Sequence, residues 1–248
     1  EDDELKTSKP TKFDLKTSST YKTFSKALAK GVDPHFVDPH TGEDNILDGI
    51  AKELKFNGLP AIKPAKEISS LTKQGHIELF RGVSKSEFTE LFKSGEYFAG
   101  QGVYGSGTYT GVGKRGARTA YGYANSQDNC LIRMVLDKNA NIITEKELAT
   151  KMDEDLRRPE VINDGLDYLM RNDPGRWAAM HGYDAILVEK QEYMIVLNRS
   201  KVTVQKEPIK DEDYYKIDKL AGRLNSLLTK KNELDDLDKK FPDNELTP

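Results

Sequence analysis

Three short motifs contain the side chains of this sequence that are best suited to chemistry, and they provide a cation, an aromatic ring and a carboxylate. The first is Phe80-Arg81-Gly82, the second is the glycine-rich stretch that ends at Tyr109, and the third is Glu192, before the apolar run 193–197. A guanidinium binds phosphate, an aromatic ring stacks on a cationic ring, and a carboxylate stabilises the positive charge that develops on a sugar as its glycosidic bond breaks. Together the motifs indicate cleavage of a phosphate-containing glycoside.

Each of these residues also has a purely structural interpretation. Arg81 shares a strand face with apolar residues, so it is expected to point inward, where a buried salt bridge would satisfy it as well as a phosphate would. Tyr109 could be a core aromatic residue. Glu192 could be a charge that protects a strand edge from aggregation, and Glu189 and Gln191 are nearby alternatives to it. The local patterns leave both kinds of interpretation open.

Residues 100–116 contain seven glycines. This density predicts a tightly folded loop around a ligand or another backbone segment. A flexible linker is the alternative, but Tyr104 and Tyr109 are interleaved with the glycines, whereas linkers favour serine and small polar residues. The basic stretch 114–118 that follows is interpreted as a solvated loop.

The elements that must position these motifs are mainly short strands. Alternating or continuous apolar residues predict strands at 76–81, 108–110, 130–136, 140–144, 184–188, 193–197 and 201–204. Apolar residues at helical spacing predict helices at 19–29, 43–56, 88–92, 145–157, 160–172, 175–181 and 212–230. Because strands do not alternate with long helices, the pattern favours an α+β fold with a mostly antiparallel sheet over a doubly wound one.

The chain divides into four segments by composition. A flexible leader (1–18) is followed by a helical lead-in (19–70), a central domain (71–207), and a C-terminal helix with a polar tail (208–248). In the last segment a heptad-like stripe of apolar residues is interrupted at Lys231. This helix is therefore expected to pack on the domain or on a partner rather than to form a long coiled coil.

The composition argues against several classes of protein, including those that bind nucleic acid or membranes through their overall charge. With 38 Lys and Arg against 41 Asp and Glu, the net charge of −3 gives no bulk attraction to nucleic acid or to an anionic membrane. No apolar run approaches the ~18 residues of a membrane span, which favours a cytoplasmic location, in a bacterium or a host cell, or association with a virion. The single cysteine, Cys130, is expected to be a buried thiol. His35 and His40 match no common metal-ligand spacing, so no metal is predicted.

Residues 76–206 resemble the ADP-ribosyltransferase superfamily. Phe80-Arg81-Gly82 is similar to the arginine form of the family's first motif, whereas Gly105-Ser106-Gly107-Thr108-Tyr109, Tyr121 and the strand after Glu192 resemble the poly-ADP-ribose polymerase branch. The combination is most similar to domains of phage head-associated and other mobile-element proteins. The resemblance implies a split, mostly antiparallel pair of sheets, with NAD+ between them and residues 71–207 as the catalytic domain.

The resemblance also implies roles for single residues. Glu192 would be the catalytic carboxylate, and Arg81 and Tyr109 would act with it. The NAD+ site would consist of Arg81, Gly82, Ser106, Gly107, Tyr109 and Tyr121. Lys190 stands where arginine-modifying members have Glu or Gln, which argues against an arginine acceptor.

The implied activity is mono-ADP-ribosyl transfer from NAD+ to a macromolecule, without a metal and without a membrane partner. A protein acceptor is favoured over a nucleic acid. An NAD+ glycohydrolase and a catalytically degenerate binding protein of a phage particle, with the same fold, are the alternatives.

Overall fold

The computed structural model describes residues 60–89, 100–123, 129–159 and 171–240, and the single positions Ser19, Lys22, Lys26 and Ile162. Several predictions fall outside these residues. They are the leader, the helices at 19–29 and 43–56, most of the helix at 160–172, and both histidines of the first loop. These stay predictions.

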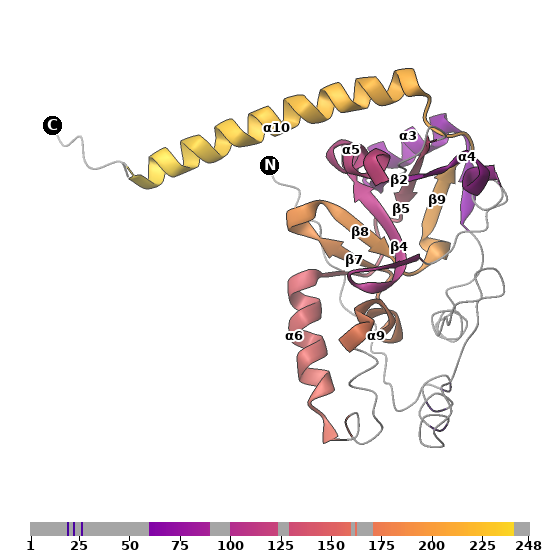
Figure 1. Ribbon diagram of the computed structural model, residues 1–248, viewed down its shortest axis with the longest axis vertical. Helices are drawn as coiled ribbons and strands as arrows, with labels where there is room; N and C mark the ends of the chain where they lie inside the picture. The colour runs from indigo at the N-terminus through magenta and orange to yellow at the C-terminus, as the bar shows by residue number, and fades with distance from the viewer. Residues whose placement is uncertain are drawn as a thin grey trace.

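Among the described residues, eight strands form one mixed sheet in the order β1-β9-β5-β2-β4-β8-β7-β6 (Figure 1). Their bounds are β1 (Ala61–Lys63), β2 (Ile77–Ser84), β4 (Gly105–Val112), β5 (Asn129–Leu136), β6 (Ile142–Thr144), β7 (Ala185–Val188), β8 (Tyr193–Val196) and β9 (Val202–Gln205). A further short strand, β3 (Gly100–Gly102), pairs with β4. The pairs β1–β9 and β6–β7 are parallel and the others are antiparallel. The prediction of an α+β fold with a mostly antiparallel sheet is confirmed.

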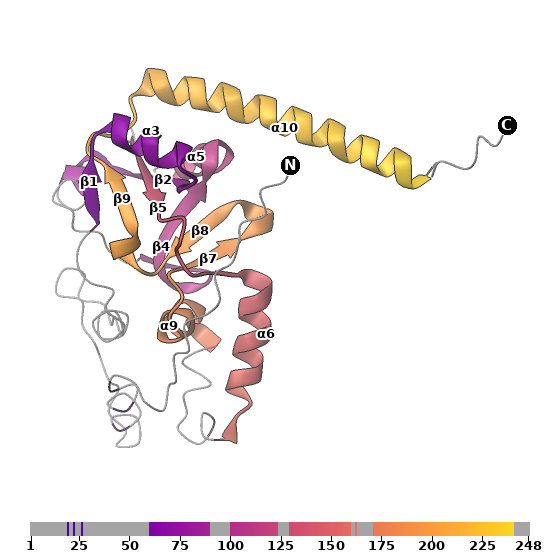
Figure 2. The ribbon, with the colours of Figure 1, turned by 180° about the vertical axis from the view of Figure 1, so that it is seen from behind.

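The helices lie in two groups, one near the top of the view and one near the bottom (Figures 1 and 2). Their bounds are α3 (Ala65–Lys73), α4 (Lys85–Glu87), α5 (Gly113–Tyr123), α6 (Glu145–Leu156), α9 (Pro174–Met180) and α10 (Asp211–Lys240). The predictions of helices at 145–157, 175–181 and 212–230 are confirmed. Near residue 88 the structure has the short α4, which starts with a capping box between Ser84 and Glu87.

The sheet divides into two halves where β2 meets β4. These strands pair only through Leu79 with Val112 and Phe80 with Gly111, whereas β2 pairs with β5 along its whole length. An apolar cluster contains Leu79 from one half and Met194 from the other, so the halves enclose a common core. The family resemblance implied two separate sheets, but the structure has one continuous sheet with a short seam between its halves.

Each half is covered on its outer face. Helices α6 and α9 cover β7 and β8, with Trp177 of α9 buried in their cluster. Helices α5 and α10 cover Phe80 of β2 and Leu131 of β5. Cys130 is buried and forms no disulfide, as expected. The residues of the three motifs therefore lie on strands, or directly before one in the case of Glu192, at the centre of a packed domain.

The prediction of a loop at residues 100–116 is wrong, because this stretch forms the hairpin β3–β4 and the start of α5. The predicted solvated loop at 114–118 is likewise wrong, since it forms the first turns of α5. The physical reason is that the glycines allow another backbone segment to pack closely against this stretch, which was one of the explanations given for them above. A Cβ atom on Gly111 or Gly116 would overlap the backbone of the other residue, so α5 rests directly on β4.

Candidate functional site

The three motifs lie on neighbouring strands. In the sheet, β2 lies next to β4, and β4 lies next to β8. The register places Phe80 opposite Gly111, and Gly111 opposite Tyr193. The fold thus brings together segments that are far apart in the sequence.

Arg81 bridges the two halves of the sheet at the end of their seam. It follows Phe80, the last residue of β2 that pairs with β4, and its Nη1 donates a hydrogen bond of 3.2 Å to the carbonyl oxygen of Tyr109. The alternation of side chains along β2 places Arg81 on the same face as Leu79, which is fully buried in the common core. This agrees with the prediction that Arg81 points inward.

The ring of Tyr109 lies on the other face of the sheet. It packs against the cluster that α6 and α9 cover, with its centroid 6.1 Å from that of Tyr193. Its hydroxyl donates to the carbonyl of Gly105 (2.8 Å) and accepts from the amide of Tyr104 (3.0 Å), so it closes the turn between β3 and β4. Burial raises the pKa of Tyr109 to about 12. The structure therefore brings the backbone of Tyr109 to Arg81, but not its ring.

Glu192 has an unusual backbone conformation. With φ 54° and ψ 41° it is left-handed, and among the described residues it alone has a positive φ without being glycine. It ends the 3₁₀ turn η2 (Glu189–Gln191), a place where glycine is usual. A left-handed residue with a side chain costs roughly 1–2 kcal/mol, and such costs are concentrated at functional sites. The conformation is a reason to look for a role of this side chain.

The carboxylate of Glu192 is held by helix α5. Its Oε1 forms an ion pair with Nη1 of Arg115, and about a third of each side chain remains exposed, 33% for Glu192 and 35% for Arg115. The carbonyl of Glu192 accepts a hydrogen bond of 2.8 Å from the amide of Val112. Both contacts fix Glu192 at the edge of β4 that lies away from β2.

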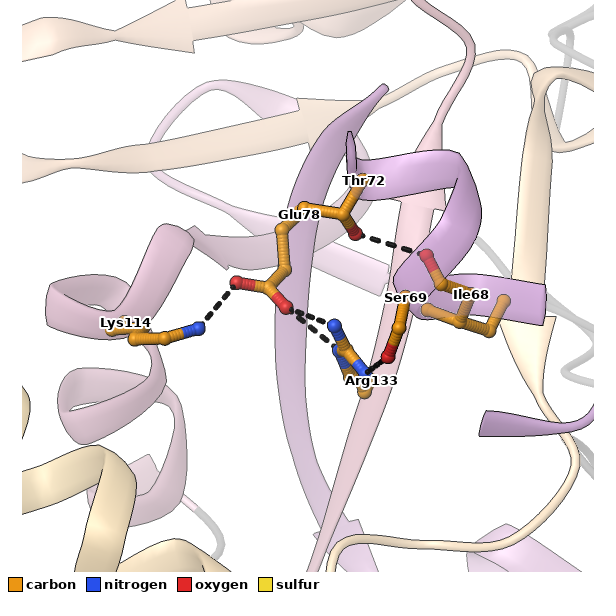
Figure 3. A network of polar contacts seen from close by, with 6 residues as sticks. All are labelled: Ile68, Ser69, Thr72, Glu78, Lys114 and Arg133. Atoms are coloured by element: carbon orange, nitrogen blue, oxygen red, sulfur yellow. Dashed lines mark hydrogen bonds and ion pairs between the residues drawn. The ribbon is translucent and has the colours of Figure 1, made fainter. Parts of the chain in front are cut away.

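A second carboxylate flanks the same turn of α5. Lys114 contacts Glu78 of β2 at 3.2 Å, and Glu78 also accepts a hydrogen bond of 2.7 Å from Nε of Arg133 (Figure 3). Arg133 in turn donates to the hydroxyl of Ser69 on α3. Two consecutive basic residues therefore tie the start of α5 to β2 on one side and to Glu192 on the other.

The contacts of Arg115 and Glu78 were not predicted from the sequence. The basic stretch 114–118 was the available signal, because basic residues beside a glycine-rich strand can pair with carboxylates of neighbouring strands. Because the stretch is helical, Lys114 and Arg115 point in different directions and contact different strands.

The other predicted site residues have structural contacts. Gly82 pairs with Leu131 of β5. The backbones of Ser106 and Gly107 pair with β3, and a Cβ atom on Gly107 would overlap Ile195. The glycines of the motif therefore allow strands to approach closely.

Tyr121 lies on α5 and faces the C-terminal helix. Its ring stacks on that of Tyr214 with centroids 3.8 Å apart and planes inclined by 16°. The structure thus pairs Tyr121 with α10, a contact that the sequence did not indicate.

No family model, curated protein or solved structure matches this chain. Within the described ranges, no helix is both long enough and apolar enough to cross a bilayer. The function is therefore inferred from the geometry of the site.

Proposed function

We propose that the protein is a mono-ADP-ribosyltransferase that cleaves NAD+ and transfers ADP-ribose to a macromolecular acceptor, a protein in preference to a nucleic acid. The observation that supports this most is the adjacency of β2, β4 and β8. It places Arg81 and Glu192 at the two edges of β4, with Arg81 just beyond the last paired residue of β2 and Glu192 opposite Val112.

In this proposal, Arg81 and Gly82 bind the dinucleotide. The guanidinium matches the geometry of a phosphate, with which it can form two parallel hydrogen bonds. Beyond Phe80 the ladder between β2 and β4 stops, so the edge of β2 at Gly82 can offer backbone groups to a carboxamide. The family resemblance assigns the nicotinamide amide to the same glycine.

Glu192 acts on the bond that breaks. The bond between C1′ of the ribose and the nicotinamide nitrogen breaks with its electron pair going to nicotinamide, which leaves as a neutral molecule. The carboxylate stabilises the positive charge left on the ribose. A nucleophile of the acceptor then forms a bond to C1′ and loses its proton to solvent. Arg115 is a positioning residue, since it holds the carboxylate through the ion pair.

Tyr109 and Tyr121 contribute less to the proposed mechanism than the resemblance implies. The hydroxyl of Tyr109 is engaged within its own hairpin, so this residue supports the strand that Arg81 contacts. Tyr121 would have to leave Tyr214 before it could stack on a nicotinamide. The chemistry is therefore assigned to Arg81 and Glu192.

A non-catalytic binding module is the second candidate function. The stacking of Tyr121 on Tyr214 and the pairing of Glu192 with Arg115 favour it, because both contacts engage groups that a substrate would need. Calorimetric titration with NAD+ separates the candidates, since a module that has lost the site produces no heat of binding.

The direct test is to incubate the purified chain with NAD+ labelled in its adenylate half, together with cell lysate. We expect label on a lysate protein or on the enzyme itself, and free nicotinamide. Replacing Glu192 by Gln should lower the rate about 10²-fold, the scale for one transition-state stabiliser. Glu189→Gln is the matched control, because Glu189 is exposed and three residues away.

Two outcomes would change the assignment. Nicotinamide release without a labelled acceptor would identify the glycohydrolase instead. An unchanged rate in Glu192→Gln would remove Glu192 from the mechanism.

A further inference from the structure

The long helix α10 has two parts with different surroundings. Its first turns pack on α5, where Ala221 is fully buried and Asp218 forms an ion pair of 2.6 Å with Arg118. Its second half extends past the sheet and the helices around it (Figures 1 and 2). A helix that meets only solvent needs no apolar residues, so the apolar residues of this half require a separate explanation.

An exposed apolar stripe runs along α10 from Leu220 into its second half. Leu227 and Leu234 leave 62% and 61% of their surfaces exposed, and Leu220, Leu224 and Leu228 are also exposed. The positions 220, 224, 227, 231 and 234 alternate in steps of four and three, which is the spacing of a coiled-coil seam. At about 100° per residue, the stripe lies about a quarter turn from the face that packs on α5. A contiguous apolar stripe of this kind marks an interaction surface.

The charges along the helix indicate what covers the stripe. Five residues from Lys216 to Lys231 are basic, and the single acidic residue among them, Asp218, faces α5. Three acidic residues follow directly: Glu233, Asp235 and Asp236. A block of positive charge is therefore followed by a block of negative charge. Only a partner helix with the reverse order of charges complements both blocks.

We propose that this partner is α10 of a second copy of the chain, packed antiparallel about a two-fold axis at the level of Thr229. Isologous two-fold pairing is the commonest form of self-association. An antiparallel copy reverses the order of charges along the helix, so Arg223 of the basic block lies level with Glu233 and Asp235 of the acidic block. In a parallel pair, Lys231 would lie against its own copy in the seam.

The stripe fixes the register of the two helices. With the axis near Thr229, Leu224 packs against Leu234 of the second copy, and Leu227 packs against the aliphatic stem of Lys231. Leu228 lies beside its own copy near the axis. At the rim, Arg223 comes close to Glu233 of the second copy. Each of these contacts occurs twice, except that between the two Leu228 side chains.

The first test is the mass of the full chain by light scattering after gel filtration, at tens of micromolar. We expect twice the chain mass of 27.9 kDa. Leu224→Asp or Leu234→Asp should give a monomer with unchanged helix content, since both side chains are exposed in the single chain. Thr229→Asp is the control, because Thr229 is exposed on the opposite side of the helix. It should stay dimeric.

A charge exchange tests the orientation. Arg223→Glu alone or Glu233→Arg alone should weaken the dimer at least tenfold, and the double variant should restore its affinity to within about threefold of the original, since the reversed pair is attractive again. In a parallel pair these residues lie about 15 Å apart along the axis, so the double variant would be weaker than either single one.

Cross-linking tests the register. Leu228→Cys should form a disulfide with its own copy, whereas Leu224→Cys should cross-link only to a chain carrying Leu234→Cys. The native Cys130 is buried and does not interfere.

Three results would overturn the proposal. The first is a monomer at these concentrations, and the second is self-cross-linking of Leu224→Cys. The third is a monomer that binds vesicles containing anionic lipid through the same leucines.

Discussion

At the scale of single residues, Glu192 combines an unfavourable backbone with an engaged side chain. Its left-handed conformation would suit glycine better, and its carboxylate is fixed by Arg115. The unfavourable conformation lies at the position where the proposed chemistry needs a carboxylate. Functional sites commonly lower the stability of a protein in this way.

Glu192→Gly and Glu192→Ala separate this strain from the loss of the ion pair. Both variants lose the pair with Arg115, but only glycine relieves the backbone. We expect the glycine variant to be more stable than the alanine variant by about 1 kcal/mol in chemical denaturation. Equal stabilities would show that the left-handed conformation carries no cost.

Arg115 tests how the carboxylate is positioned. Arg115→Ala should lower kcat for NAD+ cleavage about tenfold and leave KM nearly unchanged, because the ion pair orients Glu192 rather than the substrate. Arg115→Lys should recover part of the loss. Arg118→Ala is the control, since Arg118 lies one turn further along α5 and pairs with Asp218 instead. Similar losses in both alanine variants would contradict the positioning role.

At the scale of elements, the start of α5 is the piece that links the two sides of the site. Glycine packing sets its distance from β4, and the contacts of Lys114 and Arg115 set its orientation. The account therefore predicts that substitutions in this turn act on stability and on catalysis together.

Replacing either of two glycines of α5 by alanine should change the stability of the protein, but in opposite directions. Gly116→Ala should destabilise the protein by about 1–3 kcal/mol, because the new methyl group would overlap the backbone of Gly111. Gly122→Ala in the same helix meets no atom within 4 Å and should stabilise it by about 0.5–1 kcal/mol through helix propensity. Thermal unfolding compares them, and a stabilised Gly116→Ala would refute the close packing.

The network around Glu78 gives a second test at this scale. Its carboxylate is only 9% exposed and contacts both Arg133 and Lys114, so Glu78→Ala leaves buried charge without its partner. We expect a loss of about 2–4 kcal/mol in the free energy of unfolding. Glu67→Ala, which removes an exposed pair with Lys63, should change stability by less than about 1 kcal/mol. A similar small effect for Glu78 would contradict the role of the network.

The sequence predicted strands and helices well where the pattern is local. The runs that became β5, β7 and β8 are apolar and short, and α6 has both helical spacing and a capping box at Thr144. The strand predicted at 108–110 is the central part of β4, but the rest of the hairpin β3–β4 and helix α5 were missed, because their glycines are required by contacts with distant backbone rather than by local turns. The partners of Arg81 and Glu192 could not be predicted either, since both lie on other elements.

At the scale of the whole molecule, the order of the strands in the sheet brings together motifs that are far apart in the sequence. It places β4 between β2 and β8, so the cation and the carboxylate flank one strand next to the seam between the halves of the sheet. The second half of α10 extends away from these strands, so its proposed pairing with a second copy does not cover them.

The most direct test of the central claim is the steady-state rate of nicotinamide release from NAD+ by the full chain, by Arg81→Lys and by Glu192→Gln. The account predicts turnover by the original chain, a raised KM in the lysine variant because bidentate phosphate binding is lost, and a kcat about 10²-fold lower in the glutamine variant. Equal kcat and KM values in all three proteins, or no turnover and no NAD+ binding by the original chain, would contradict it.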